Sequence, residues 1–332
     1  MEDKIKNIIK KEFDANTLEI QKLAEGFSHD KFLIKFDKPP FEAIVRFENA
    51  SIKDKEKGLV VEKWVIEKLR ERNIPAPEIY RFNNSQEEQK DNYMIIEKLQ
   101  GTRLDSIWDN LTQGEKIQIT EEIGKLLSQI HSIKLDSFGK IKAGGQVYSD
   151  LTRYMFKNAN ETSQEFNWFA RELFQFSASD IGRLISYKNI KKELPGKLID
   201  FISQNLEIWK YEGKPTLIHG DFHKDHFFIK KQNNIWKITG LIDFEFAASL
   251  CPEYDMLKLD RQGFFDDPEL MNAFEKGYGK FNLNAVKIYR IIRDIGFGCV
   301  LIDCGNTKKG IELLNSAESQ INSFDQTKSQ KS

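Results

Sequence analysis

Apolar residues recur at helical and then at alternating intervals near the start of the chain. Ile5, Ile8, Ile9 and Phe13 are three or four positions apart, which predicts a helix over residues 3–13. Apolar and polar positions then alternate, as in strands with one buried face. The alternation predicts antiparallel strands at residues 18–23, 32–36 and 43–47.

A second amphipathic helix and two more strands follow. Residues 59–69 have apolar positions at helical spacing, and the helix is expected to end before Pro75 because proline blocks its continuation. Residues 78–82 and 93–99 read as strands on either side of a polar hairpin. The first hundred residues therefore predict a small sheet crossed by one helix.

Helical periodicity dominates after Gly101. The predicted helical segments are residues 117–130, 149–178, 196–210 and 268–320. Two short apolar runs, residues 227–230 and 236–244, are separated by a turn-prone tetrapeptide and predict a hairpin. We expect an α+β protein with a nucleotide-binding lobe over residues 1–99, a helical catalytic and substrate lobe over 100–324 and a disordered polar tail over 325–332.

Charge and cysteine content exclude several classes of protein. The 332 residues include 50 basic and 51 acidic side chains, so no global field attracts nucleic acid or an anionic membrane. The N-terminus lacks the apolar core of a signal peptide, and no stretch approaches the roughly 18 apolar residues of a membrane span, so we expect a cytoplasmic protein. Cys251, Cys299 and Cys304 contain no CxxC pair, which argues against a disulfide framework or a thiolate zinc site. We expect all three to be buried.

Two short motifs supply the groups that phosphoryl transfer requires. His219-Gly220-Asp221 follows an apolar run, and His226 comes five residues after Asp221. Asp221 is the candidate carboxylate for an acceptor hydroxyl, and His226 the candidate metal ligand. Asp243 lies at the end of the second run of the hairpin and offers a hard oxygen to Mg²⁺. Either motif alone is common by chance, but in this order, joined by a hairpin, they indicate an active site.

The other polar residues nearby have simpler expected roles. His219 is expected to be a structural, hydrogen-bonded residue beside the loop. We expect His223 and His29 to be solvated loop residues, His29 within reach of a nucleotide, and Asp225 to lie on the surface.

These motifs resemble those of the aminoglycoside phosphotransferase and choline kinase superfamily, small-molecule relatives of the protein kinases. The resemblance covers residues 15–320 and implies a protein-kinase-like fold with a small antiparallel-sheet N-lobe and a mostly helical C-lobe. It also implies Mg²⁺-dependent transfer of the γ-phosphate of ATP or GTP to a hydroxyl of a small molecule. The family's loop is HGDxxxxN, whereas this chain has His226 in place of the asparagine. Histidine there resembles aminoglycoside 2''-phosphotransferases and macrolide phosphotransferases, and its imidazole can still bind Mg²⁺.

The resemblance assigns phosphate-binding roles in the N-lobe. Gly26 permits a tight turn and Ser28 can meet a β-phosphate, although the alternative for this segment is an ordinary hairpin. Arg46 takes the place of the family's phosphate-binding lysine, and its fork can hold phosphate and Glu62 together. Glu62, on the predicted helix, is the partner carboxylate. The alternative for Arg46 and Glu62 is an exposed surface ion pair.

Further roles follow from the same resemblance. The backbone at Glu97 and Leu99 is expected to hydrogen-bond a purine, and Ile96 behind the base leaves room for GTP as well as ATP. Asp255, in a segment that resembles the family's D-P-x-x-D turn, is expected to pin the catalytic loop. His131 is expected to be structural.

The acceptor is less well defined. An acid-rich segment suits a cationic acceptor such as an aminoglycoside, or is a solvated helix face with capping acids; its members are Glu253, Asp255, Asp260, Asp266, Asp267 and Glu269. Aromatic residues could line a macrolide pocket, or belong to the core; these are Tyr148, Tyr154, Phe156, Trp168 and Phe169. The HGDxxxxH variant favours an aminoglycoside-type, antibiotic-resistance kinase.

Three alternatives stay open. They are a metabolic kinase of the choline, homoserine or methylthioribose type, a macrolide phosphotransferase, and an inactive nucleotide-binding pseudokinase. Arg46 and His226 depart from the family pattern and favour the pseudokinase, whereas the retained Asp221 and Asp243 argue against it. We expect a monomer or weak homodimer.

Overall fold

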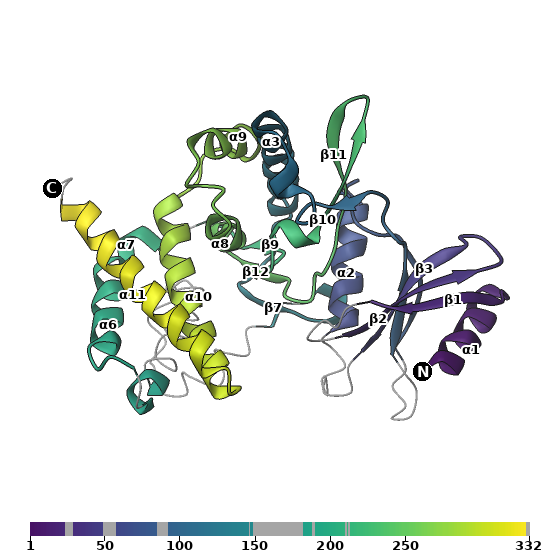
Figure 1. Ribbon diagram of the computed structural model, residues 1–332, viewed down its shortest axis with the longest axis horizontal. Coiled ribbons are helices and arrows are strands. Elements are labelled where there is room, and N and C mark those ends of the chain that lie inside the picture. Colours follow the sequence, from purple (N-terminus) through teal and green to yellow (C-terminus); the bar gives the residue numbers. More distant parts are fainter. Residues whose placement is uncertain are drawn as a thin grey trace.

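A five-stranded antiparallel sheet forms the N-terminal region (Figure 1). The computed structural model describes residues 1–23, 29–48, 58–84, 92–145, 147–148, 182–187, 190–209, 211 and 213–329. In sheet order the strands are β1 (Thr17–Lys22), β2 (His29–Phe36), β3 (Glu42–Glu48), β5 (Tyr93–Ile96) and β4 (Ile79–Asn83). All neighbouring pairs are antiparallel, as predicted, and β5 ends three residues before the predicted strand end.

Two helices cover opposite faces of this sheet. On one face, α1 (Glu2–Phe13) packs against alternate residues of the strands, among them Val45 and Phe47 of β3. On the other, α2 (Leu59–Arg70) shares a core with the helical part of the chain. Because side chains alternate along a strand, Arg46 between Val45 and Phe47 points to the α2 face. The sheet thus presents Arg46 to the interior between the two regions.

The C-terminal part is mostly helical, as predicted (Figure 1). Its longer helices are α3 (Gln113–His131), α6 (Leu194–Gln204), α8 (Glu253–Arg261), α9 (Pro268–Tyr278), α10 (Leu283–Asp303) and α11 (Thr307–Ser329), with the short α7 (Leu206–Trp209) after α6. A capping box formed by Thr112 and Glu115 begins α3, and Asp267 caps α9. The helix α8 was not predicted, because its first residues resemble a turn motif.

Two small sheets lead into the loops that carry His219–Asp221 and Asp243. One has the order β8 (Val147–Tyr148), β7 (Gly139–Ile141), β12 (Ala248–Leu250) and β9 (Thr216–Ile218), and the other has the order β11 (Ile235–Leu241), β10 (Phe227–Gln232) and β6 (Thr102–Arg103). The predicted hairpin is β10 and β11. Asn233 and Asn234 at its turn both have positive φ, 48° and 61°, a conformation that asparagine tolerates.

The predictions for the C-terminal tail and for one of the three cysteines are not confirmed. The backbone of α11 continues to Ser329, so residues 325–329 are helical and the disordered tail predicted from residue 325 is wrong there. Cys251 and Cys299 are buried, but Cys304, which follows the last residue of α10, is exposed, so its predicted burial is wrong. The helix predicted over 149–178 lies entirely outside the described residues. In the described part of the chain, no helix has the length and apolar character to cross a bilayer.

Candidate active site

The loop that begins with His219 is held by one buried carboxylate. Asp255, in the first turn of α8, accepts hydrogen bonds from the amide of His219 at 2.7 Å and from the amide of Gly220 at 2.6 Å. His131 Nε2 lies 3.1 Å from the same carboxylate. Gly220 has a φ of 78° and lies against the carbonyl of Phe246, where a Cβ atom would clash. Asp255 and His131 therefore have the structural roles expected of them.

His219 links the two loops that carry the candidate acids. Its Nε2 is 3.0 Å from the carbonyl oxygen of Ile242, which can only accept, so Nε2 carries the proton. Its Nδ1 then has the lone pair, and it accepts from the amide of Asp221 at 3.2 Å. Burial lowers the pKa of His219, in keeping with this neutral form. His219 is a structural tie, as expected.

Asp243 comes two residues after β11 in a left-handed conformation, with a φ of 71°. Arg46 Nη2 is 3.5 Å from its Oδ1, and Lys31 Nζ is 2.8 Å from its Oδ2. Burial alone would raise the pKa of Asp243, but the charges of Arg46 and Lys31 outweigh it and hold this pKa well below its usual range. The carboxylate is ionised at neutral pH, and two cations already face it.

Arg46 and Glu62 form the predicted ion pair, and it is buried. Nη1 of Arg46 contacts Oε1 of Glu62 directly, and the two side chains are only 3% and 1% exposed. The alternative of an exposed surface pair is therefore wrong. The pair joins β3 to α2 and fixes the guanidinium, whose other terminal nitrogen faces Asp243.

His226 is oriented toward Asp243. It ends a short 3₁₀ turn, Lys224–His226, and its Nδ1 lies 2.9 Å from the backbone carbonyl of Asp221. Nδ1 must be the donor, which leaves the Nε2 lone pair 3.9 Å from Oδ2 of Asp243. Burial, with smaller effects from His219 and His223, lowers the pKa of His226 to about 2, so the ring is neutral.

The His226 and Asp243 pair fits a divalent ion. Two atoms bound to one Mg²⁺ at about 2.1 Å lie no more than about 4.2 Å apart, and the observed separation is within that limit. A histidine that binds metal usually donates its other N–H to a carbonyl or carboxylate, as His226 does. These two residues are therefore suited to hold Mg²⁺ against phosphate oxygens.

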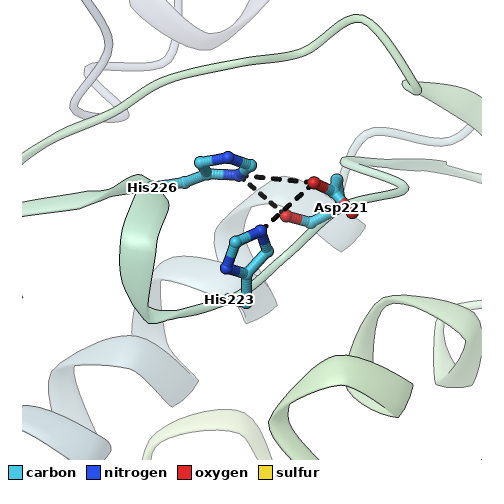
Figure 2. Close-up of side chains that lie close together, drawn as sticks. All are labelled: Asp221, His223 and His226. Carbon is cyan, nitrogen blue, oxygen red and sulfur yellow. Dashed lines mark hydrogen bonds and ion pairs between the residues drawn. The ribbon is translucent and has the colours of Figure 1, made fainter. Parts of the chain in front are cut away.

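Two neighbours of Asp221 were not foreseen. Lys258 of α8 contacts its Oδ1. His223 Nε2 is 3.2 Å from its Oδ2 (Figure 2). The side chain of His223 is only 15% exposed, so its prediction as a solvated loop residue is wrong. Burial and the charges of Arg261 and Arg293 lower the pKa of Lys258 to about 8. Asp225 is 43% exposed, as expected of a surface residue.

Neither Lys258 nor Lys31 was predicted as a site residue, although the sequence contained a signal for each. Lys258 follows Asp255 by three residues, which places both on one face of a helix, but the segment was read as a turn. Lys31 is the cross-strand partner of Arg46, and its neighbour Phe32 packs toward α1, so Lys31 shares the face of Arg46.

The segment after β5 offers two backbone groups for a purine. The amide of Glu97 donates to Glu78, and the side chain of Glu97 accepts from the amide of Glu78. Among the described residues, neither the Glu97 carbonyl nor the Leu99 amide has a hydrogen-bond partner. Gly26 and Ser28 lie outside the described residues, as does the side chain of His29.

The acid-rich segment is largely engaged in structural contacts. Asp255 holds the catalytic loop, Asp260 is buried and pairs with Arg290 at 2.6 Å, and Asp267 caps α9. Asp255 and Asp260 are buried, so the alternative of a solvated helix face is wrong for these two residues, and its expectation of a capping acid is confirmed for Asp267. The side chains of the aromatic residues proposed for a macrolide pocket all lie outside the described part of the chain, namely Tyr148, Tyr154, Phe156, Trp168 and Phe169.

Comparison with known proteins agrees with the family that the sequence motifs resemble. The model of the phosphotransferase enzyme family matches residues 19–289. Similar solved structures include the GDP complex of wild-type aminoglycoside 2'-phosphotransferase-IIIa, with a TM-score of 0.68 and 14% identity over 95% of this chain and 98% of that one. The streptomycin-ATP-APH(2")-IIa ternary complex has a TM-score of 0.62 and 17% identity over 96% and 98% of the two chains.

A relative outside the antibiotic kinases is also similar. A putative fructosamine-3-kinase from Thermobifida fusca has a TM-score of 0.60 and 11% identity over 96% of this chain and 98% of that one. At these identities the likeness concerns the fold. No curated protein sequence gives a significant match.

Proposed function

The chain belongs to the phosphotransferase enzyme family, and from this premise we propose that it transfers the γ-phosphate of ATP or GTP to a hydroxyl group of a small molecule. One observation carries the proposal. His219 ties together a loop bearing Asp221 and a loop bearing Asp243, so that a candidate base and a candidate metal ligand flank one place. Phosphoryl transfer requires this kind of positioning more than covalent chemistry.

Each residue then has a defined task. Asp221 accepts the proton of the acceptor hydroxyl as the oxygen attacks phosphorus. His226 Nε2 and Asp243 hold Mg²⁺, which, when bound, neutralises charge on the phosphate oxygens. Arg46, fixed by Glu62, and Lys31 add positive charge beside the same phosphates.

The nucleotide is proposed to lie between the sheet and the catalytic loop. The Glu97 carbonyl and Leu99 amide would bond the purine edge, and Gly26 and Ser28 would meet the β-phosphate. Donor and acceptor groups at two backbone positions serve either purine, so ATP and GTP are both retained as donors. We propose a cytoplasmic monomer or weak homodimer.

An aminoglycoside is the acceptor favoured by the HGDxxxxH motif. Support comes from similar solved structures of aminoglycoside phosphotransferases in complex with kanamycin, gentamicin and streptomycin. A metabolic alcohol is the second candidate, favoured by the engagement of Asp255, Asp260 and Asp267 in structural contacts and by the similar putative fructosamine-3-kinase. A pseudokinase is disfavoured, because both candidate catalytic acids are retained. The amide of Asp221 is bonded to His219, and Asp243 lies beside His226, Lys31 and Arg46.

Steady-state turnover tests the proposal. ATP and GTP are each assayed with aminoglycosides, macrolides, choline, homoserine, methylthioribose and fructosamines, and Asp221→Ala serves as the blank. Mg²⁺-dependent phosphorylation of at least one alcohol supports the kinase. Turnover of metabolites alone would exclude the aminoglycoside acceptor. Nucleotide binding that calorimetry finds independent of Mg²⁺, with no turnover of any acceptor, would favour the pseudokinase.

A further inference from the structure

Three side chains of the catalytic loop point toward one another (Figure 2). Asp221, His223 and His226 each offer one ligand atom, and these atoms all lie within 4.8 Å of one another. The turn Lys224–His226 brings the second ring back over the first, with centroids 4.1 Å apart. We propose that these residues form a second metal site, which takes a transition-metal ion such as Zn²⁺ and stops phosphoryl transfer when it is occupied.

The separations suit a small coordination sphere. Oδ2 of Asp221 is 3.2 Å from His223 Nε2 and 3.9 Å from His226 Nδ1. Ligand atoms bound to Zn²⁺ at about 2.0–2.2 Å in a tetrahedral site are about 3.4 Å apart. The three candidate ligand atoms lie within 4.8 Å of one another, so the side chains would have to move closer together to bind one ion. Lys258 contacts the other oxygen, Oδ1, and leaves Oδ2 facing the rings.

The ligand set selects the kind of ion. Two imidazoles and one carboxylate suit Zn²⁺ and neighbouring transition metals, whereas the pair proposed for Mg²⁺ has a single imidazole, and Mg²⁺ otherwise prefers oxygen ligands and retains water. The site also differs from the one proposed for Mg²⁺. That ion uses Nε2 of His226 with Asp243, and the second site uses Nδ1 of the same ring with Asp221 and His223.

The two sites compete for one imidazole. A neutral ring has a single lone pair, and with Nδ1–H donated to the Asp221 carbonyl that lone pair is on Nε2. A metal at Nδ1 requires loss of this hydrogen bond and moves the proton to Nε2, which removes His226 from the Mg²⁺ pair. The same metal takes the lone pairs of Asp221 that receive the hydroxyl proton. Inhibition, but not metal binding, therefore rests on the proposed function.

Calorimetry tests binding without any turnover. Zn²⁺ is titrated into the nucleotide-free protein, its His223→Ala variant and, as a control for a thiol site, Cys304→Ser, since Cys304 is an exposed thiol. We expect one strong site in the wild type and in Cys304→Ser, and at least tenfold weaker binding in His223→Ala. Co²⁺ bound at the same site should give visible absorption that His223→Ala loses. Equal affinity for His223→Ala, with folding verified by its thermal transition, would overturn the proposal.

Turnover then tests the consequence. Each protein's rate with Zn²⁺ is divided by its own Zn²⁺-free rate at fixed Mg²⁺, so a change in the basal rate of His223→Ala does not matter. We expect inhibition of the wild type near the calorimetric Kd, relieved by excess Mg²⁺, and at least tenfold more Zn²⁺ needed for His223→Ala. Binding without any kinase activity would count against the proposed function alone. Activity with identical Zn²⁺ sensitivity in both proteins would overturn the second site alone.

Discussion

Lys31 and Arg46 are cross-strand partners on β2 and β3, and both side chains reach the carboxylate of Asp243. The five-stranded sheet therefore contacts the loop that bears Asp243, in the helical part, through two positive charges. These charges keep Asp243 ionised despite its burial. They also lie where phosphate charge is proposed to arrive.

Replacement of Lys31 tests this arrangement. Lys31→Met should raise the KM for nucleotide about tenfold, equivalent to about 1.4 kcal/mol, because one charge beside Asp243 and the phosphates is lost. Lys35→Met is the matched control, since Lys35 lies on the same strand but pairs with Glu19 at the exposed edge. Equal KM values for the two variants would show that Lys31 does not contribute to nucleotide binding and has only a structural role.

The buried pair of Arg46 and Glu62 is expected to govern stability as well as binding. Glu62→Gln removes the counter-charge that contacts Nη1 of the buried Arg46 and leaves only Asp243 near the guanidinium, which should lower the free energy of unfolding by about 3 kcal/mol. Denaturant unfolding measures this loss. Glu67→Gln, which breaks the exposed pair with Lys63, should cost less than about 1 kcal/mol. Similar losses in both variants would contradict the account.

Acid sensitivity is expected at the start of α3. Hydrogen bonds from Trp236, Lys231 and Thr112 lower the pKa of Glu115 to about 2, from an ordinary value of 4.5. A depressed carboxyl pKa contributes stability above the unfolded value, and that contribution disappears as the pH falls from 4.5 through about 2. Denaturant unfolding at pH 6 and pH 3 should therefore show a smaller difference between wild type and Glu115→Gln at pH 3. A stability difference between wild type and Glu115→Gln that is larger at pH 3 than at pH 6 would contradict the lowered pKa of Glu115.

Local patterns were sufficient for most of the fold. Period-2 and helical spacings predicted the strands of the five-stranded sheet, α1, α2, α3 and the β10–β11 hairpin. The helix α8 was missed, since Pro252 begins it where a turn was expected. The burial of α10 did not extend to Cys304, which lies just past its last residue.

The candidate site was only partly predictable. The Arg46–Glu62 pair followed from the family resemblance and from the placement of both residues on predicted elements. Contacts such as Lys31 to Asp243 join residues 212 positions apart and depend on how the sheet meets the helical part. Local sequence patterns do not predict how the sheet packs against the helical part. The contact between Lys258 and Asp221 likewise depends on tertiary packing. The assignments of Gly26 and Ser28 remain predictions.

Asp221 is the residue on which the central claim depends. The most direct measurement combines single-turnover phosphoryl transfer with nucleotide binding in Asp221→Ala, with the exposed Asp225→Ala as the control. We predict that Asp221→Ala lowers the transfer rate by about 10²–10⁴-fold while nucleotide affinity stays close to wild type, because the carboxylate acts on the acceptor hydroxyl. Transfer at the control rate, or loss of nucleotide binding in parallel with transfer, would contradict its role as the base.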